Sequence, residues 1–545
     1  MASPNLNSVG VNDAVPVSSN INIRALVNTD NMKWGTGAAG TGVTLTYSFI
    51  TSSSTFGAGA GNTSYGSDEI GGPEYEPTTA TALTTSEKTA VQQALQDWAN
   101  VANVKFTLVS DNATTVGEIR IGKSAVVGNN DAAGWAYTPW YTNFPAAGDL
   151  WLARVGDGFN DDGGAVPKGS YDYSTLLHEL GHALGLQHPH SDAIPGETTL
   201  PETAETMLLT VMSYQYGVIF EREPSTPMVL DIQAMQYLYG ANNTFNSGNN
   251  TYTYTQAGQY LLTIWDAGGT DTIVYSSATG GVINLNPGAA SQLGDPFAVY
   301  DYDSFGYLYD ETRTVWIAYG VQIENATGGS GNDQIIGNDW ANTLKGYGGD
   351  DLLEGGSADD LLLGGVGNDD LGGGTGVDVM FGDDGNDTLR GGAGADDMRG
   401  ATGNDMLYGG SSADQLKAGA GNDTLDSGAG NDILTSGDGN DRFVFDDALA
   451  ADNVDTVVDF QVGADTIVLD QGLFTVLGPG SLSAANFAAN PGHVPGDNND
   501  FILYDTTTGG LYYDADGSNP GAAAVQFAML TGAPLISATD LEVVA

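Results

Sequence analysis

The amino-acid sequence predicts a multidomain protein, in which an α+β domain precedes an all-β domain of parallel stacked strands and a β-rich C-terminal cap. Its length of 545 residues exceeds what one ordinary domain needs. The first half mixes amphipathic helix patterns with alternating strand patterns. Residues 328–445 then repeat a nine-residue unit, and residues 446–545 have the pattern of short strands separated by turns.

Alternating apolar residues mark the strands of the N-terminal half. These strands are expected at residues 43–50, 104–109, 119–121 and 148–155. Residues 1–25 are small and polar without periodicity, so they are expected to form a flexible leader or pro-segment. Residues 51–82 are rich in Ser, Thr and Gly and are expected to form a loop.

Two helices are expected from the residues at their ends. The first follows Thr84, whose spacing from Glu87 fits a capping box and which precedes a single apolar stripe. The second covers residues 228–239, with a proline before it and a glycine after it. A boundary after this helix gives a first domain at residues 26–242 and a β-rich transition region at residues 243–327.

The composition is strongly acidic and contains no cysteine. The chain has 68 acidic and 15 basic residues, a formal net charge of -53. Such a surface repels nucleic acid and anionic membranes, and the lack of cysteine excludes disulfides and thiolate metal sites. No apolar run approaches the ~18 residues that span a bilayer, and the N-terminus lacks a Sec-type signal pattern. We therefore expect no nucleic-acid partner and no membrane insertion.

One motif has the spacing of a catalytic metal site. His178 and His182 are four residues apart, so one helix presents both imidazoles on the same face. Glu179 lies beside the first histidine and is expected to act as the base that activates a water. Gly185 permits the left-handed conformation that ends a helix, which lets the chain bring His188 back to the metal. Three neutral histidines leave an open position, as catalytic zinc requires.

The alternative is a helix with surface histidines, which a bare His-Glu-x-x-His pattern leaves open. Of the five histidines in the chain, three fall on the extended motif, and this favours the zinc site. His190 is expected in a loop and His493 at the surface.

The motif resembles the metzincin signature. The residue after the third histidine is Pro189, and this choice resembles the serralysin branch of that family. The resemblance implies an α+β metzincin zinc-protease domain. Met212 would be a structural residue beneath the zinc ligands. Tyr214 would be a further zinc ligand and a catalytic residue that swings away to hydrogen-bond the oxyanion. The resemblance continues through residues 231–242 and 265–271.

In metzincins the substrate lies along an edge strand above the zinc, and the strand at residues 149–155 is the candidate in this chain. Backbone pairing of this kind does not depend on side chains, which fits broad specificity. The resemblance therefore implies a zinc-dependent endopeptidase that binds protein or peptide substrates and a proteinaceous protease inhibitor.

The nine-residue unit repeats thirteen times from Gly328 to Val444, with the pattern Gly-Gly-x-Gly-x-Asp-x-apolar-x. The pattern resembles the RTX nonapeptide, which implies a calcium-binding parallel β-roll at residues 328–445. In such a roll two units would make one coil of eighteen residues with the apolar residue inside, and the stacked carboxylates would repel unless a cation lay between them. Without calcium, this acidic segment is expected to be disordered.

The resemblance also implies the calcium ligands. The sixth positions of the units are Asp333, Asp351, Asp360, Asp369, Asp378, Asp387, Asp396, Asp405, Asp414, Asp423, Asp432 and Asp441. One ion would be held by two stacked turns, through Gly329, Gly331 and Asp333 with Gly346, Gly348 and Asp351. A further site before the roll would use Asp266, Gly268, Gly269, Asp271 and Glu324. Asn342, with Trp340 at a glycine position, weakens the second unit.

Calcium modules outside cells bind at ~10⁻⁴–10⁻³ M, so the chain would stay unfolded inside the cell and fold outside. This fits export by a type I secretion apparatus. Residues 446–545 are expected to form the cap and the secretion signal. The signal is expected there because residues 540–544 resemble the acidic-then-apolar end of the substrates of such an apparatus. The expected protein is a secreted, extracellular endopeptidase with Zn²⁺ and Ca²⁺ as cofactors. The alternative is a non-enzymatic, calcium-dependent surface or adhesion protein, which the intact Glu179 disfavours.

Overall fold

The computed structural model describes residues 11–12, 19–27, 33–51, 54, 80–112, 115–124, 133–139, 148–153, 159–160, 164–190, 199–200, 204–213, 218–301, 304–518 and 523–545. The chain divides into two compact units. Unit 1 comprises Met1–Asn249, Ala257–Gly269 and Pro287–Gln322, and unit 2 comprises Asn250–Gln256, Thr270–Asn286 and Ile323–Ala545. Residues 243–327, expected as one transition region, are thus shared between the two units.

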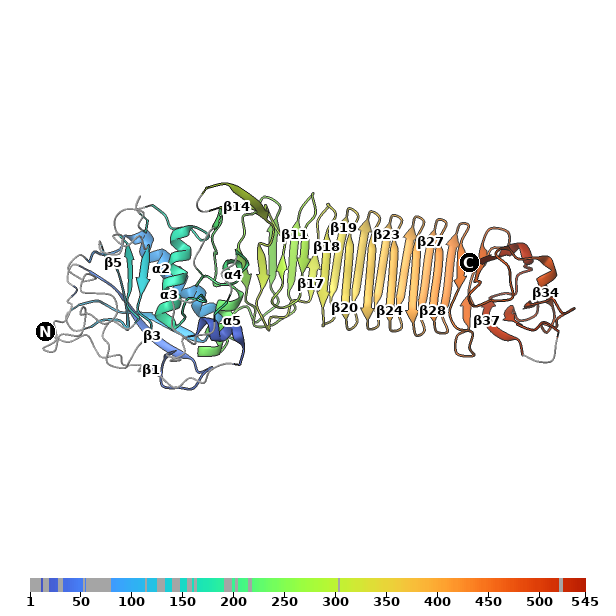
Figure 1. The fold of residues 1–545 in the computed structure, drawn as a ribbon, viewed down its shortest axis with the longest axis horizontal. Coiled ribbons are helices and arrows are strands. Elements are labelled where there is room, and N and C mark those ends of the chain that lie inside the picture. The colour runs from blue at the N-terminus through green and yellow to red at the C-terminus, as the bar shows by residue number, and fades with distance from the viewer. Residues whose placement is uncertain are drawn as a thin grey trace. The chain divides into compact units, whose positions relative to one another are not determined.

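Unit 1 contains a five-stranded sheet in the order β4-β3-β5-β7-β6, of which Figure 1 labels β3 and β5. Its strands are β3 (Val43–Phe49), β4 (Val104–Leu108), β5 (Ile119–Ser124), β6 (Gly134–Ala136) and β7 (Leu150–Ala153). Neighbouring strands are parallel, except that β6 runs antiparallel to β7. The four strands predicted in this half of the chain are confirmed; the last begins at Leu150, and residues 154–155 of that prediction lie outside the described residues.

The described helices of unit 1 are α1 (Ile21–Leu26), α2 (Thr85–Val101), α3 (Tyr171–Leu184), α4 (Ala204–Leu209) and α5 (Val229–Tyr239). The capping box predicted before α2 is present, since the Thr84 N–H donates to Glu87 Oε2 at 2.7 Å and the Glu87 N–H donates to Thr84 Oγ1 at 3.3 Å. Trp98 of α2 is fully buried and donates its indole N–H to the Leu177 carbonyl of α3 at 3.2 Å. This contact fixes α2 against the helix that carries the histidine motif.

The last part of residues 1–25, the expected flexible leader or pro-segment, contributes to a helix that was not predicted from the sequence. Asn20 caps α1, and its side chain donates to Gln233 Oε1 of α5 at 3.3 Å. Ala25 and Leu26 are fully buried. Sequence periodicity missed α1 because six residues are too few to display an apolar stripe.

Three smaller sheets lie in the described part of unit 1. The first pairs β1 (Val11–Asn12) with β2 (Lys33–Trp34). The second has the order β15-β14-β8, with β8 (Val218–Phe220), β14 (Phe297–Asp301) and β15 (Tyr307–Glu311). The third has the order β10-β16-β13, with β10 (Leu262–Ile264), β13 (Ala290–Ser291) and β16 (Val315–Ile317).

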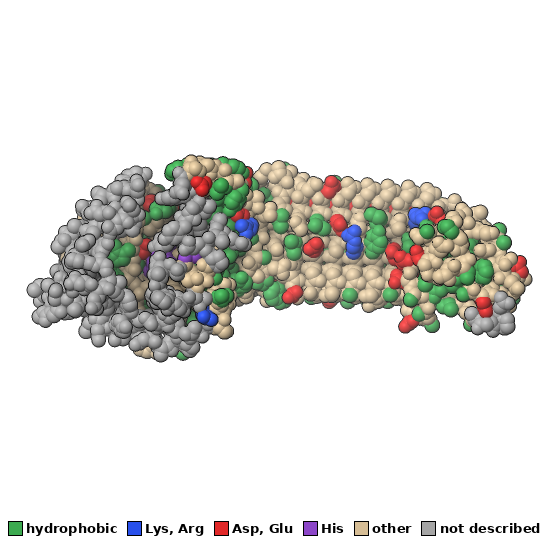
Figure 2. Space-filling view, in the orientation of Figure 1, with side chains coloured by type: hydrophobic (Ala, Val, Ile, Leu, Met, Phe, Trp, Pro, Cys, Tyr) green, Lys and Arg blue, Asp and Glu red, His purple; other side chains and the backbone are tan. Residues whose placement is uncertain are grey.

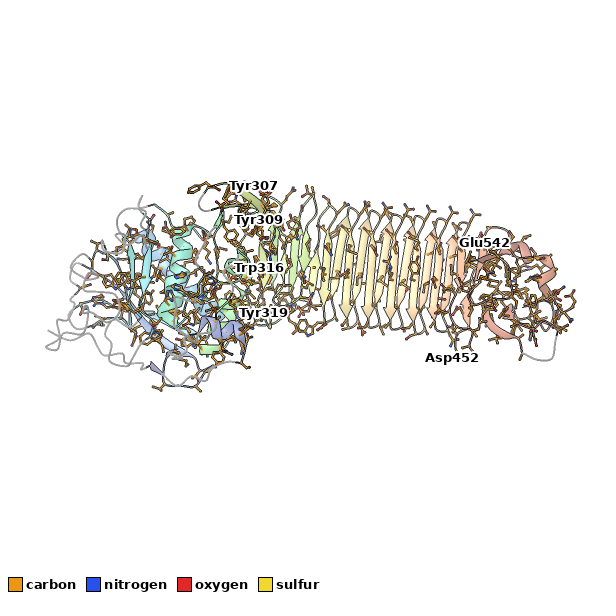
Figure 3. All side chains as sticks on the ribbon, in the orientation of Figure 1. Tyr307, Tyr309, Trp316, Tyr319, Asp452 and Glu542 are labelled. Atoms are coloured by element: carbon orange, nitrogen blue, oxygen red, sulfur yellow. The ribbon has the colours of Figure 1, made fainter. Side chains whose placement is uncertain are left out.

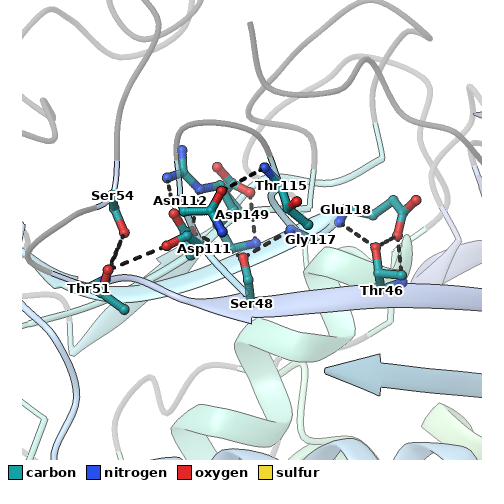
Figure 4. A network of polar contacts seen from close by, with 11 residues as sticks. Thr46, Ser48, Thr51, Ser54, Asp111, Asn112, Thr115, Gly117, Glu118 and Asp149 are labelled. Carbon is teal, nitrogen blue, oxygen red and sulfur yellow. Dashed lines mark hydrogen bonds and ion pairs between the residues drawn. The ribbon is translucent and has the colours of Figure 1, made fainter. Parts of the chain in front are cut away.

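A buried polar network joins β3, β5 and the start of β7 (Figure 4). Arg120 forms a bidentate ion pair with Asp111, in which Nε and Nη2 each lie 2.9 Å from a carboxylate oxygen. The Ser48 hydroxyl donates to the same carboxylate at 3.1 Å. The backbone N–H of Arg120 donates to Asp149 Oδ1 at 2.9 Å, and Asp149 directly precedes β7. The network therefore fixes the position at which β7 begins.

Unit 2 contains two long sheets of mostly parallel strands (Figure 1). The first has the order β34-β35-β36-β37-β31-β29-β27-β25-β23-β21-β19-β17-β11-β9, and the second has the order β12-β18-β20-β22-β24-β26-β28-β30-β32-β38-β33. The first sheet consists of β9 (Thr251–Thr255), β11 (Thr272–Ser276), β17 (Asn325–Thr327), β19 (Thr343–Gly348), β21 (Leu361–Val366), β23 (Val379–Asp384), β25 (Asp397–Thr402), β27 (Gln415–Ala420), β29 (Ile433–Asp438), β31 (Asp455–Val457), β34 (Phe487–Asn490), β35 (Ile502–Asp505), β36 (Gly510–Tyr513) and β37 (Val525–Leu530). The second consists of β12 (Val282–Asn284), β18 (Gln334–Asn338), β20 (Leu352–Ser357), β22 (Asp370–Thr375), β24 (Thr388–Ala393), β26 (Met406–Ser411), β28 (Thr424–Ala429), β30 (Arg442–Phe445), β32 (Thr466–Asp470), β33 (Gly480–Ser481) and β38 (Leu541–Val544).

Successive nine-residue units alternate between the two sheets. Ile335 pairs with Leu353 in one sheet and Leu344 pairs with Leu362 in the other, so one coil takes eighteen residues, as the repeat predicts. The eighth residue of every unit, from Ile335 to Phe443, is 0% exposed. This large domain of parallel strands fits the predicted β-roll, whose core is a ladder of single apolar side chains from each unit.

The C-terminal cap continues both sheets. Strand β37 pairs parallel with β31, and β38 pairs parallel with β32. Phe474 packs edge-on against Tyr513 and Phe527, with ring centroids 5.0 Å and 5.3 Å away. The segment predicted as the secretion signal is the strand β38. Within the described residues, every helix is too short or too polar to cross a lipid bilayer.

Candidate metal centre

Helix α3 and the turn after it bring the histidine motif together. Ser170 caps the helix, and its hydroxyl accepts from the Tyr173 N–H at 3.2 Å. Gly185 ends it with a φ of 110°, a left-handed conformation that favours glycine. After this turn, Gln187 donates its N–H to the Leu26 carbonyl at 2.9 Å. Helix α1 therefore holds the turn that carries the third histidine.

The three histidines of the motif point their Nε2 atoms at one place. The Nε2 atoms of His178 and His182 lie 3.1 Å apart, and the Nε2 atom of His188 lies 3.1 Å and 3.0 Å from them. A tetrahedral zinc with ordinary Zn–N bonds separates its nitrogen ligands by ~3.3 Å. The triangle of nitrogens therefore fits a zinc ion with its fourth position open.

Backbone carbonyls orient two of these rings. His178 Nδ1 lies 2.8 Å from the Val211 carbonyl oxygen, and His182 Nδ1 lies 2.8 Å from the Leu186 carbonyl oxygen. A carbonyl accepts only, so each Nδ1 carries the proton and each Nε2 keeps its lone pair. Burial, with a smaller contribution from a neighbouring histidine, lowers the pKa of each of the three rings to about 3. Neutral imidazoles of this kind are the form that binds zinc.

Glu179 lies on helix α3 and is buried beside the three histidines. Burial raises the pKa of Glu179 to about 8, whereas a hydrogen bond from the Ala136 N–H lowers it. Its Oε2 is buried and, among the described residues, has no hydrogen-bond partner. A Cβ added to Gly134 would lie 3.1 Å from Glu179 Cγ, so strand β6 packs tightly against this side chain.

The turn that contains Met212 lies under the metal helix. Met212 is fully buried, and a Cβ added to Gly181 would lie 2.5 Å from its Sδ. Sequence reasoning missed the group that holds this turn, which is Asp231 at the start of α5. Its Oδ2 accepts from the Val211 N–H and the Met228 N–H, each at 2.8 Å. In the sequence, Asp231 is visible only as an acidic residue at the third position of the helix. Helix capping alone explains an acid there, so this position does not point to the Met212 turn.

Thr210 completes this network, because its hydroxyl donates to Asp231 Oδ1 and accepts from the Met212 N–H at 3.0 Å. Burial raises the pKa of Asp231 to about 7, while its three donors lower it. Tyr214, predicted as a ligand and catalytic residue, lies outside the described residues, and its role stays a prediction.

His190, expected as a plain loop residue, is 6% exposed and contacts the same turn. Its Nε2 lies 2.6 Å from Ser213 Oγ, and its Nδ1 lies 3.2 Å from the Leu200 carbonyl oxygen. Because a carbonyl oxygen only accepts, Nδ1 of His190 carries the proton. Nε2 is then an acceptor, and the Ser213 hydroxyl donates to it. No spacing rule links His190 to Ser213, which explains why the sequence did not reveal the contact.

The prediction that residues 149–155 form the substrate edge strand is wrong. Strand β7 is paired on both sides, with β5 and with β6. The edge of the described sheet is β6, which runs antiparallel to β7 and carries Trp135 between Gly134 and Ala136. The sequence missed β6 because three residues are too short to show an alternating pattern.

The predicted calcium ligands form a buried ladder in unit 2. The Asp333 N–H donates to Asp351 Oδ1 at 2.7 Å, and the Asp351 N–H donates to Asp369 Oδ1 at 2.8 Å. Every sixth-position aspartate retains one buried carboxylate oxygen that lacks a hydrogen-bond partner among the described residues. Beside them, a Cβ on Gly346 would lie 2.0 Å from Asp351 Oδ2, and the Gly329 N–H donates to Asp333 Oδ2 at 2.7 Å.

Burial and neighbouring carboxylates raise the pKa values of several of these aspartates. Burial is the larger cause, and the pKa rises to about 7 for Asp351, Asp360, Asp405 and Asp414. A ladder of buried, unsatisfied oxygens fits calcium, which takes six to eight oxygen ligands. Asn342 contrasts with the aspartates, because its Nδ2 donates to the Glu324 carbonyl at 3.0 Å and its Oδ1 accepts from the Asn338 N–H at 2.8 Å. The side chain of Asn342, at the sixth position of the second repeat unit, therefore has hydrogen-bond partners without a cation.

The other predicted glycine ligands have less distinctive surroundings. A Cβ on Gly331 would lie 2.2 Å from the backbone nitrogen of Gly280, whereas one on Gly348 meets no atom closer than 3.7 Å. The set proposed before the roll is divided between the units. In unit 1, Asp266 Oδ1 accepts from the Gly268 N–H at 2.8 Å, and Gly269 has a φ of 150°. In unit 2, the Asp271 N–H donates to Glu324 Oε2 at 2.8 Å. Both sets stay predictions.

Comparison with known proteins finds one matching family model and several relatives. Residues 229–477 match the family model described as peptidase M10 serralysin C terminal. A serralysin of Photorhabdus laumondii is 36% identical over 290 residues, which cover 48% of this chain and 55% of the relative. A serralysin of Proteus mirabilis is 32% identical over 294 residues, or 47% and 55% of the two chains. The metalloprotease AprA of Pseudomonas entomophila is 33% identical over 286 residues, or 48% and 54%.

The chain spans about half the length of the curated relatives it matches. The family model covers α5, the roll and the beginning of the cap, and the histidine motif lies before it. The resemblance predicted from the sequence is thus confirmed, since residues 229–477 match the peptidase M10 serralysin C-terminal model and the relatives include serralysins.

Proposed function

We propose that the chain is a secreted zinc-dependent endopeptidase that cleaves extracellular proteins with broad specificity. The observation that carries this proposal is the convergence of three neutral Nε2 atoms within 3.1 Å of one another, two of them on the helix that also presents the buried Glu179 and the third, from His188, in the turn after it. Zinc bound there would polarise a peptide carbonyl and lower the pKa of a water to ~7. The serralysin and metalloprotease relatives support the same activity.

The side chains of this chain supply the remaining chemistry. Glu179 would accept a proton from the attacking water at Oε2, the atom without a partner among the described residues, and would return it to the leaving amine. The carbonyls of Val211 and Leu186 keep the Nδ1 protons of His178 and His182 in place, so the ligand nitrogens stay oriented through the cycle. Tyr214 would hydrogen-bond the oxyanion, as the family resemblance implies.

Strand β6 is the part of the site that would bind substrate. As the edge of the described sheet, it offers backbone groups to an extended peptide, and the Ala136 N–H already contacts the Glu179 carboxyl group. Backbone pairing of this kind supports broad specificity. The same edge would serve a proteinaceous inhibitor that presents an extended segment.

Calcium would fold the roll, and this supports secretion through a type I apparatus. Inside the cell the aspartate ladder would remain without its cation, and the buried oxygens would oppose folding. Outside, calcium would occupy the ladder and the chain would fold. The strand β38 would carry the C-terminal secretion signal.

Casein hydrolysis tests the peptidase proposal. Treatment with o-phenanthroline is expected to abolish hydrolysis, and added Zn²⁺ is expected to restore it. The Glu179→Gln variant is expected to keep its zinc and lose ~10²–10⁴-fold in turnover. Activity that survives chelation contradicts the zinc dependence, and equal turnover by the variant contradicts the role of Glu179. Absence of hydrolysis by the zinc-loaded parent protein would instead favour a calcium-dependent adhesion protein.

A further inference from the structure

The hairpin formed by β14 and β15 exposes large apolar side chains (Figure 2). Phe305 is 72% exposed, Tyr307 58% and Leu308 47%. Strand β15 lies at the edge of its sheet and pairs, within the described residues, with β14 alone. Four consecutive residues of β15 are exposed, so both faces of this strand are accessible. Figure 3 marks Tyr307 and Tyr309 on it.

A packed base holds the hairpin in place. Phe297 and Val299 of β14 are fully buried, and the Phe297 ring lies 5.8 Å from the ring of Phe220 on β8. The guanidinium of Arg222 lies 5.5 Å from the Phe297 ring centroid. On the accessible side, Tyr307 packs edge-on against Tyr300 with centroids 6.3 Å apart. The exposed side chains therefore stand on a rigid support, and binding does not have to order them.

The charge around the hairpin selects among possible partners. Residues 295–313 contain five acidic residues and one basic residue. The basic residue, Arg313, is used locally, since its Nε lies 2.9 Å from Glu311 Oε1 and its Nη2 lies 3.0 Å from Glu311 Oε2. The surplus is negative, as is the chain as a whole at -53. Anionic surfaces and a second copy of the chain are therefore repelled, and cationic partners are attracted.

We propose that the β14–β15 hairpin is a docking surface for an extended polypeptide segment rich in lysine or arginine. An exposed edge strand pairs with an added strand through its backbone, and aromatic faces beside carboxylates bind ammonium and guanidinium groups. The surface is distinct from the β6 edge and does not require catalysis. In the proposed peptidase it would hold a polypeptide at a second place, a consequence that rests on the proposed function.

Peptide binding to the full-length, calcium-loaded protein tests the proposal, in a Glu179→Ala background that prevents cleavage. The probes are a fluorescein-labelled decapeptide of alternating lysine and valine and a matched peptide of alternating glutamate and valine. The lysine peptide is expected to bind at least tenfold more tightly. Tyr307→Ser and Leu308→Lys are each expected to weaken its binding about tenfold, the loss typical of a central interface residue.

Matched control variants remove general charge effects. Tyr347→Ser makes the same change as Tyr307→Ser, and Val366→Lys is also an aliphatic-to-lysine change. Both residues lie in the roll and are 61% exposed, and both variants are expected to leave binding unchanged. Circular dichroism checks that all variants fold. Equal binding by hairpin variants and parent overturns the proposal. So does a hairpin-dependent affinity for phosphatidylcholine vesicles instead of the peptide, or a dimer that Leu308→Lys dissociates in sedimentation.

Discussion

The Nδ1 atom of His178 lies 2.8 Å from the carbonyl oxygen of Val211, a residue 33 positions later in the chain. The first predicted zinc ligand is thus oriented by the residue that precedes Met212. Val211 in turn donates its N–H to Asp231 Oδ2 at 2.8 Å, and Asp231 is fully buried at the start of α5. Three segments that are distant in sequence together determine where the His178 ligand nitrogen points.

This relay predicts that Asp231→Ala weakens zinc binding ~10–100-fold, the usual effect of removing a group that supports a metal ligand. The substitution leaves the Thr210 hydroxyl and the Val211 and Met228 N–H groups without their acceptor, at a cost of about 1–3 kcal/mol each. Chelator competition measures the zinc affinity. Asp231→Asn keeps one acceptor oxygen and is expected to lose less. Unchanged affinity in both variants would show that the relay does not orient His178.

A second prediction concerns the contact between β6 and the base. A Cβ at position 134 would lie 3.1 Å from Glu179 Cγ and 3.3 Å from the Trp151 carbonyl oxygen, so Gly134→Ala must displace the Glu179 side chain. Casein hydrolysis is expected to fall about tenfold in kcat with little change in KM, because a misplaced base affects the reaction more than binding. Zinc content is expected to stay at one ion. A change confined to KM would place Gly134 in substrate binding alone.

The parts of the site that the sequence predicted are those determined by short spacing. Two histidines four residues apart share a helix face, and Gly185 ends that helix, whatever the rest of the chain does. The roll was equally predictable, because its period of nine residues places every Leu, Ile, Met or Phe of the core by counting.

The parts that the sequence missed depend on pairing between distant segments. Asp231 reaches the Val211 turn across twenty residues, and His190 reaches Ser213, which lies 23 positions later in the chain. Strand β6 becomes the edge of its sheet only because β7 pairs with β5 on its other side. Composition and periodicity carry no information on such pairings, so the error over residues 149–155 could not be avoided from one sequence.

Removal of one ladder aspartate tests the calcium prediction. Asp387 is fully buried, and one of its carboxylate oxygens has no partner among the described residues, so Asp387→Ala is expected to raise the calcium concentration at the folding midpoint several-fold. Asp384→Ala removes the same charge from an exposed position of the same repeat unit. This variant is expected to change the calcium concentration at the folding midpoint little. Far-ultraviolet circular dichroism during calcium titration of the full-length protein gives both midpoints. Equal shifts would mean that net charge, not a specific site, controls folding.

The last prediction concerns a buried lysine in unit 1. Lys33 is 0% exposed, its Nζ donates to the Thr41 carbonyl at 2.7 Å, and burial lowers its pKa from 10.5 to about 8. Between pH 8 and 10.5 the unfolded chain holds a proton on Lys33 that the folded chain has lost. Unfolding therefore takes up a proton in this window, and the free energy of unfolding gains up to ~1.4 kcal/mol per pH unit from this group as the pH rises.

Lys33→Met is expected to remove that contribution, so the free energy of unfolding should rise less steeply from pH 8 to 10 in the variant than in the parent. Denaturant titrations at constant zinc and calcium measure both slopes. Tyrosines titrate in the same range, but the parent and the variant contain the same tyrosines, so their effect cancels in the difference. Lys105→Met, at an exposed position on β4, is the matched control and should keep the slope of the parent. If Lys33→Met also keeps that slope, Lys33 remains charged in the folded protein despite its burial, and the hydrogen bond to Thr41 together with the Tyr239 ring 4.9 Å away is sufficient to hold the ammonium.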